Sequence, residues 1–92
     1  MKTLKLTLKK KWFDMILSGE KGEEYREIKP YWVSRLVGKN YKFVEFTNGY
    51  GNHRPSFKIE LKGIYTRPGH LTWGAPKESV FVLELGDIVR QE

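Results

Sequence analysis

A cluster of charged side chains of both signs at residues 19–26 is the part of the sequence best suited to chemistry. Glu24 and Arg26 lie two residues apart, so on a strand they share one face. An arginine fork suits a phosphate or the edge of a base, and a glutamate beside it could orient a cation or accept a proton. Lys21 precedes them in a turn and could bind phosphate or, if removed from water, act as a base. The alternative is a solvated strand with surface salt bridges.

A basic run and an aromatic pair supply further candidate contacts for an anionic ligand. The lysines at 9–11 could contact phosphates, or they form the solvated start of a helix. Cations are disfavoured at that end of a helix, which favours the functional interpretation slightly. Lys29 is a further candidate phosphate contact. Tyr31 is the better exposed candidate for stacking on a base, because Trp32 beside it equally fits a core position.

Three loop residues complete the candidate set. Asn48 and Tyr50 lie in a polar, glycine-containing segment, where they could give hydrogen bonds or stacking to a ligand, or serve only the chemistry of a turn. Trp73 lies in a later loop, and either flanks a ligand or fixes that loop to the core.

The composition limits the classes of protein and of site. The 92 residues fit one domain, spanning 1–92. The net charge of +6 favours a polyanionic partner, of which nucleic acid is the commonest inside cells, although many basic domains bind none. The absence of cysteine excludes disulfides and thiolate metal ligands. His53 and His70 lack the spacing of metal ligands, so we expect no metal and no cofactor.

The apolar pattern gives no sign of a membrane segment. Residues 1–6 alternate in polarity and lack the apolar core of a signal peptide. No apolar run approaches the ~18 residues of a membrane-spanning helix. We therefore expect a cytoplasmic protein without membrane contact, and the sequence indicates no oligomeric state.

Short elements position these candidates. Strict alternation over 3–8 predicts a half-buried strand. Apolar residues at 12, 13, 16 and 17 predict a helix over 10–18, ending at Gly19 in the left-handed conformation. Pro30 predicts the start of a second helix, with Trp32, Val33, Leu36 and Val37 on its apolar face and Gly38 at its end. The remaining patterns predict strands at 23–27, 41–47, 57–61 and 80–85.

Two glycines indicate where the later strands bend or end. Gly63 interrupts the alternation, so we expect a bulge or bend before Ile64 and Tyr65. Gly86 is expected to end the last strand and to lead into a short tail. The predicted order is strand, helix, strand, helix and then three strands, an α+β protein that is mainly β. About five strands with two short helices close most economically into a small barrel, although other α+β arrangements fit the pattern.

The octet Gly19-Glu20-Lys21-Gly22-Glu23-Glu24-Tyr25-Arg26 is similar to G-x-K-x-x-E-x-R, the motif of the ASCH (activating signal cointegrator homology) domain among the PUA-like barrels. The alternating strand and the helix before it, and the final strand followed by Gly86-Asp87, also resemble that family in order. The resemblance covers nearly the whole chain. It implies a barrel with an adjacent cleft lined by Lys21, Glu24 and Arg26, and a role in binding RNA or nucleotides.

The resemblance leaves binding and catalysis both open. Some small relatives hydrolyse the amide of N4-acetylcytidine and look like G-x-K-x-x-T-x-R here, with the lysine and threonine as catalytic groups. Lys21 matches that lysine, but Glu24 stands in place of the threonine. We therefore expect RNA or nucleotide binding. The alternative is a small hydrolase of a modified nucleoside or of RNA, with Lys21 and Glu24 as its catalytic groups. A protein-interaction module has no specific support.

Overall fold

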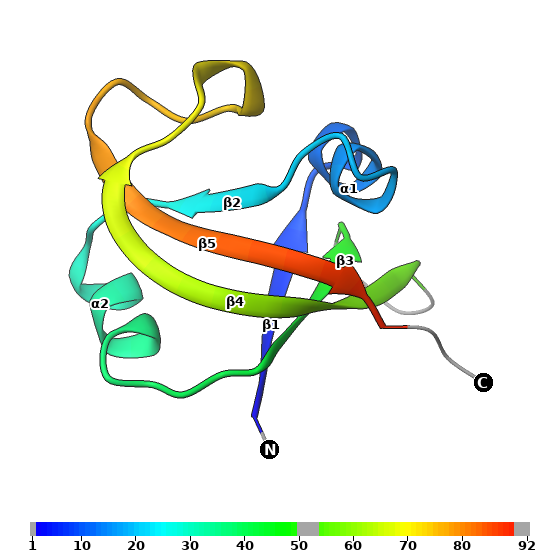
Figure 1. The fold of residues 1–92 in the computed structure, drawn as a ribbon, viewed down its shortest axis with the longest axis horizontal. Coiled ribbons are helices and arrows are strands. Elements are labelled where there is room, and N and C mark those ends of the chain that lie inside the picture. The colour runs from blue at the N-terminus through cyan, green and yellow to red at the C-terminus, as the bar shows by residue number, and fades with distance from the viewer. Residues whose placement is uncertain (1, 50–53, 90–92) are drawn as a thin grey trace.

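The fold is a curled sheet of five strands with two short helices beside it. The computed structural model describes residues 2–49 and 54–89. Its elements, in chain order, are β1 (Thr3–Leu8), α1 (Lys10–Leu17), β2 (Glu23–Arg26), α2 (Pro30–Leu36), β3 (Phe43–Asn48), β4 (Ser56–Pro68), the 3₁₀ turn η1 (Leu71–Trp73) and β5 (Ser79–Ile88). The prediction of a mainly β α+β fold with five strands and two short helices is confirmed (Figure 1).

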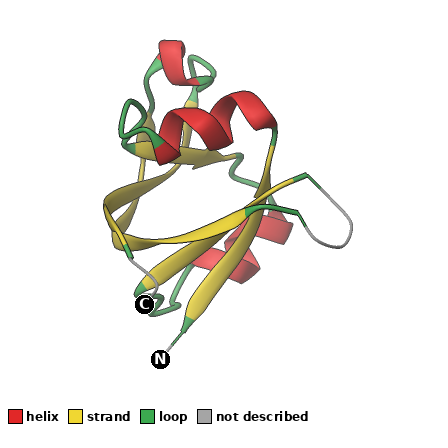
Figure 2. Ribbon diagram, turned by 90° about the vertical axis from the view of Figure 1, so that its right-hand side faces the viewer, coloured by secondary structure: helices red, strands yellow, loops and turns green. Residues whose placement is uncertain are grey.

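The order of strands in the sheet is β1-β3-β4-β5-β2, so β1 and β2 form its two edges. The strands β1 and β3 pair in parallel, because α1, β2 and α2 lie between them in the chain and carry the backbone across. All other pairs are antiparallel. The sheet curls into a half-barrel, which is clearest from the side (Figure 2).

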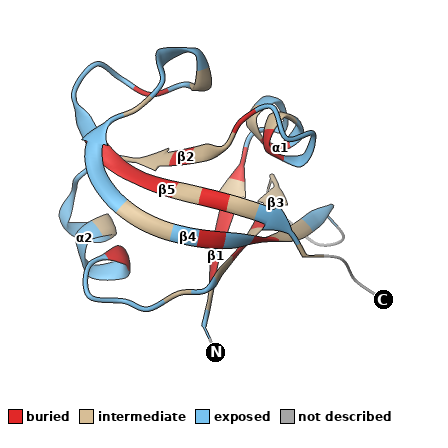
Figure 3. Cartoon of the chain, in the orientation of Figure 1, coloured by how far each residue is buried: buried red, intermediate tan, exposed pale blue. Residues whose placement is uncertain are grey.

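The buried residues are distributed over all five strands and both helices (Figure 3). The alternation predicted for β1 is confirmed, since Leu4, Leu6 and Leu8 are all buried. Alternating residues of β3 and β4 are buried in the same way, β5 is buried continuously over residues 80–83, and α1 adds Phe13 and Ile16. The ring of Phe13 meets the ring of Phe57 edge to face at 5.0 Å between centroids, which joins α1 to the start of β4.

Both predicted helices end one residue or more earlier than expected. In α1, Ser18 is already the cap, and Gly19 follows with φ +88°, so the predicted left-handed glycine is confirmed. In α2 the last helical residue is Leu36, which is also its only buried residue. Val37 lies outside the helix and is 57% exposed, so its place on the predicted apolar face was wrong. A helix of two turns presents only a narrow stripe to the sheet.

The two long strands differ from the prediction. A single β4 runs from Ser56 to Pro68, and its pairing with β5 shifts register between Ile59 and Gly63. The predicted irregularity near Gly63 is therefore confirmed, but the strand continues beyond it. The expected tail at Gly86 was wrong, since β5 extends to Ile88. The reason is tertiary: the Glu60 side chain accepts the Asp87 backbone N–H at 2.9 Å and keeps this end of β5 against β4.

Candidate functional site

The turn after α1 sends Lys21 into the protein. With Gly19 in the left-handed region, its N–H donates to the Ile16 carbonyl and the Lys21 N–H donates to the Met15 carbonyl, at 3.1 and 3.0 Å. These bonds fold the chain back over the end of the helix. The side chain of Lys21 consequently points inward and is only 1% exposed.

Lys21, Glu24 and Arg26 form one continuous network. The Lys21 Nζ donates to Glu24 Oε1 at 2.9 Å and to the Glu23 carbonyl at 2.6 Å. Glu24 Oε2 accepts from Arg26 Nη2 at 2.6 Å. The carboxylate therefore holds one cation on each oxygen, which is the arrangement that charge-assisted hydrogen bonds favour in a site of low exposure.

The ammonium of Lys21 lies among apolar groups as well as charges. Its Nζ is 4.9 Å from the centroid of the Tyr25 ring and 5.5 Å from that of Trp12. Burial lowers the pKa of Lys21, and the nearby charge of Arg26 lowers it further. The charge and hydrogen bond of Glu24 act in the opposite direction without cancelling the effect of burial.

Arg26 joins the two edges of the sheet. Its Nη2 also donates to the Thr7 carbonyl of β1 at 3.3 Å, so a side chain of β2 reaches the opposite edge strand. Its guanidinium carbon lies 5.0 Å from the centroid of the Trp32 ring of α2. Contacts from β1, β2 and α2 thus fix this guanidinium. Its Nε is buried without a hydrogen-bond partner in the described structure.

A cleft of about 650 Å³ opens at this junction of the two edge strands. Its volume suits a nucleoside-sized ligand. The residues of its wall that carry charge, hydrogen-bonding groups or an aromatic ring include Lys9, Lys10, Trp12, Glu24, Arg26 and Asn48. Lys21 stands behind Glu24 and is not part of the wall.

A larger hollow of about 930 Å³ lies elsewhere, between the end of α1 and the end of β5. Its wall includes Leu17, Leu85 and Ile88, with Lys21 and Asp87 as its charged members. The only ammonium in that wall is already bonded to Glu24. We take the smaller cleft as the candidate site because its polar groups converge, which size alone does not provide.

The other predicted site residues separate into groups. Asn48 lies in the wall of the cleft, whereas Tyr50 lies outside the described residues. Lys29 is exposed and pairs with Glu27 at 2.9 Å, away from the cleft. Trp73 is half-buried with its ring 4.4 Å from that of His70, and it does not line the cleft.

Tyr31 lies at the start of α2, outside the cleft and 59% exposed. The rings of Tyr31 and Trp32 are nearly perpendicular, with 4.8 Å between their centroids. Trp32 itself packs partly against the core, as its apolar position indicated.

The sequence interpretation missed Trp12. Its helical spacing assigned it to the core, and it does pack there in part, but it also forms part of the cleft wall. Its position directly after the basic run was the available signal. Lys10 from that run lines the cleft while pairing with Asp14 at 2.6 Å, and Lys11 lies 4.7 Å from the Trp12 ring centroid.

A second hydrogen-bond network fixes the connection between β4 and β5 beside β2. The Tyr25 hydroxyl donates to Glu23 Oε1 at 2.8 Å and accepts the His70 backbone N–H at 3.0 Å, while Arg67 pairs with the other oxygen of Glu23. Burial, supported by the bond to Glu23, raises the pKa of Tyr25 to about 12. Burial alone would raise the pKa of Glu23, but the hydrogen bonds from Arg67 and Tyr25 outweigh it and lower that pKa.

Comparison with known proteins provides no relative. No protein-family model matches the chain, and neither a curated protein nor a solved structure matches it. In the described ranges 2–49 and 54–89, no helix has the length and apolar character needed to cross a membrane. The same residues include no group of three or more histidine, aspartate or glutamate side chains placed to hold a metal ion. The function is therefore argued from the geometry of the cleft.

Proposed function

We propose that this chain is an ASCH-type domain that binds RNA or a nucleotide in the cleft between β1 and β2. The observation that carries the proposal is the position of Arg26, whose guanidinium is fixed through Nη2 by Glu24 and Thr7 while it forms part of the cleft wall. A pre-oriented fork of this kind suits a phosphate or the edge of a base.

The charges around the cleft favour an anionic ligand. Within the motif network, the carboxylate of Glu24 offsets one of the two cations that it contacts, so the trio keeps a net positive charge. Lys9 and Lys10 add ammonium groups on the same wall. Trp12 offers the edge or face of a ring to a base, a contact worth about 1–3 kcal/mol in single-strand binders.

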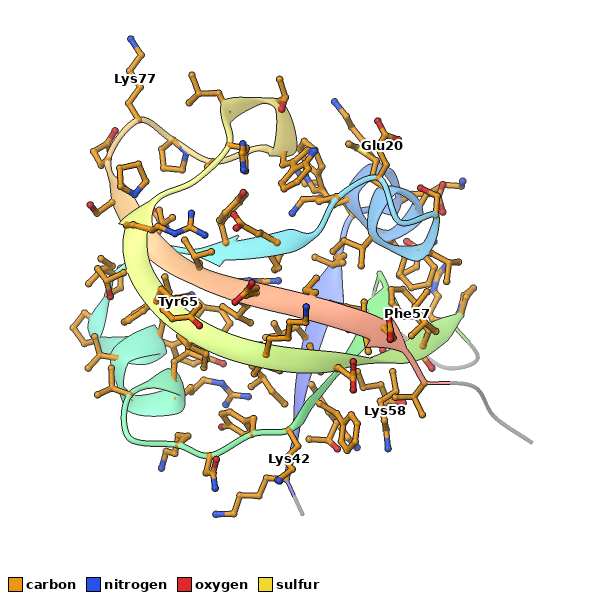
Figure 4. The ribbon with its side chains drawn as sticks, in the orientation of Figure 1. Glu20, Lys42, Phe57, Lys58, Tyr65 and Lys77 are labelled. Atoms are coloured by element: carbon orange, nitrogen blue, oxygen red, sulfur yellow. The ribbon has the colours of Figure 1, made fainter. Side chains whose placement is uncertain are left out.

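Titration of short RNAs and nucleotides at several salt concentrations tests this proposal. We expect affinity to fall steeply with salt, because binding releases counterions. Arg26→Ala should abolish most of the affinity. Lys9→Ala should reduce the salt slope by about one for each phosphate contact removed. Lys77→Ala is the matched control, since Lys77 points away from the body of the molecule (Figure 4).

Circular dichroism and urea unfolding of each variant separate loss of binding from loss of fold. Lys9 is exposed and its substitution removes no described side-chain contact, so it tests the proposal even where Arg26→Ala destabilises the protein. Equal affinities for the native chain, Lys9→Ala and Arg26→Ala would refute the assignment of the cleft. Undetectable binding of every RNA and nucleotide at low salt would refute the function.

A hydrolase acting on an N-acylated nucleoside or on RNA is the second candidate, favoured by the lowered pKa of Lys21. A lysine that takes part in acid–base catalysis needs a depressed pKa. Because Lys21 meets the cleft only through Glu24, Glu24 would contact the substrate, and Lys21 would set the charge of the Glu24 carboxyl group. Chromatography of N4-acetylcytidine and RNA after incubation with the protein tests this. Activity that survives Glu24→Gln, or no turnover by the native chain, would exclude this assignment.

A further inference from the structure

A second hollow adjoins the cleft on the other side of the Arg26–Thr7 contact. It has a volume of about 340 Å³. Its wall includes Lys5, Thr7, Arg26, Tyr31, Trp32 and Arg35. Two of these, Thr7 and Arg26, also form part of the wall of the cleft. The two hollows therefore meet at one guanidinium.

The hollows follow one another along the edge strand β1. The second hollow borders residues Lys5 to Thr7, and the cleft borders Thr7 to Lys10. Thr7 borders both hollows, so the two are contiguous along β1.

The second hollow carries an aromatic platform with a fixed orientation. Tyr31 is 59% exposed, and its ring plane stands at 88° to that of Trp32. The guanidinium of Arg35 lies 5.3 Å from the centroid of the Tyr31 ring. Trp32 also contacts Arg26, so one side chain of α2 orients both the ring and the shared guanidinium. An exposed ring held in this way is a ready surface for stacking a base.

The charge of the second hollow is positive. It combines Lys5, Arg26 and Arg35, and within the described ranges neither Lys5 nor Arg35 takes part in an ion pair. The acidic groups nearby are Glu24, which is bonded to Arg26, and Glu45, the neighbour of Lys5 in the pairing of β1 with β3. A phosphate beside Arg26 would meet more cations than anions.

We propose that the two hollows form one track for single-stranded nucleic acid, with consecutive nucleotides in the cleft and against Tyr31, and the connecting phosphate near Arg26. This inference rests on the proposed function and deepens it, because it names a polymer and not a free nucleotide as the ligand. Because Nη2 already donates to Glu24 and Thr7 and Nε is buried, the donor to the connecting phosphate in this proposal is Nη1.

Calorimetric titration of nucleoside monophosphates against the matched 5′-phosphorylated dinucleotides, in ribose and deoxyribose forms, tests the track. One added stacked base should tighten binding about 5- to 150-fold. Tyr31→Ala should remove most of this gain and Tyr31→Phe should retain it. Arg35→Ala should reduce the salt slope for the dinucleotide by about one. Lys77→Ala should leave the gain as it is in the native chain.

The outcomes separate this inference from the proposed function. If monophosphates bind and the dinucleotides of both sugars bind no tighter, the track is refuted while the cleft keeps its function. If Tyr31→Ala leaves the gain unchanged, or duplex RNA competes better than the single strand, the track is refuted as well. If no nucleotide or dinucleotide binds, both proposals fail. A larger gain for one of the two sugars supports the track and identifies the polymer.

Discussion

Removing the carboxylate of Glu24 should destabilise the protein more than any other single charge deletion in the motif. In Glu24→Ala the ammonium of Lys21, 1% exposed, loses the only ion pair that it makes with the described residues and keeps the Glu23 carbonyl. Arg26, 18% exposed, loses the same partner but can turn toward water. Breaking a buried pair from one side costs about 3–5 kcal/mol. Because one partner can be rehydrated, we expect the lower end, about 3 kcal/mol.

That loss is large for a domain of 92 residues. At roughly 0.05–0.15 kcal/mol per residue, the free energy of unfolding is about 5–14 kcal/mol. A loss of about 3 kcal/mol then lowers the melting temperature by roughly 12–24 °C. Urea unfolding followed by tryptophan fluorescence at neutral pH measures the change directly. Glu20→Ala is the control, because Glu20 is exposed on the neighbouring turn (Figure 4) and should change stability by less than about 0.5 kcal/mol.

A second substitution checks the physical cause. Adding Lys21→Met to Glu24→Ala removes the ammonium that would otherwise be buried alone, so the double variant should be more stable than Glu24→Ala. The pH dependence of the free energy of unfolding gives another check. The folded-state pKa of Lys21 lies below its ordinary value of 10.5, so between these two pKa values the unfolded chain binds more protons than the folded protein. This lysine therefore increases the free energy of unfolding as pH rises toward 10.5. A Glu24→Ala protein within 1 kcal/mol of the native one, or a double variant that is less stable still, would refute this reasoning.

Three further predictions concern neighbouring residues. Tyr25→Phe should remove a loss of stability that the native protein shows as pH rises from 10 to about 12, since the folded state holds that proton longer than the unfolded chain, and pH-dependent unfolding measures it. Gly74→Ala should cost about 1–3 kcal/mol and change the near-ultraviolet circular dichroism, because φ is +93° and the new Cβ would lie 2.8 Å from the Trp12 ring. Gly19→Ala should cost only about 1 kcal/mol in thermal unfolding, because φ is +88° and no atom lies within 4 Å.

Each of these has a result that contradicts it. An unchanged alkaline profile in Tyr25→Phe would mean that burial does not raise the pKa of this hydroxyl in the folded state. Equal costs for Gly74→Ala and Gly19→Ala would mean that contact with Trp12 adds nothing to backbone strain. Gly22→Ala serves as the control for both glycines, since its φ is ordinary and nothing lies within 4 Å of the added Cβ.

Local patterns in the sequence were enough to predict most of the elements. Alternation in β1 and the helical spacing in α1 each depend on neighbours a few residues apart, where side-chain direction follows directly from backbone geometry. Gly19 and the irregularity at Gly63 could be predicted for the same reason. Alternation along the predicted strand also placed Glu24 and Arg26 on one face, and their side chains are in contact at 2.6 Å.

Only the tertiary structure decided how these elements make a site. The contact of Arg26 with Thr7 joins residues 19 positions apart on opposite edges of the sheet, and no local pattern specifies that the edges meet. The inward direction of Lys21 depends on the turn and on the burial of Glu24. Trp12 was assigned to the core because spacing reports which face of a helix is apolar, but not whether a cleft opens beside it. Contacts between distant segments depend on packing of the whole curl, which is information that local periodicity does not contain.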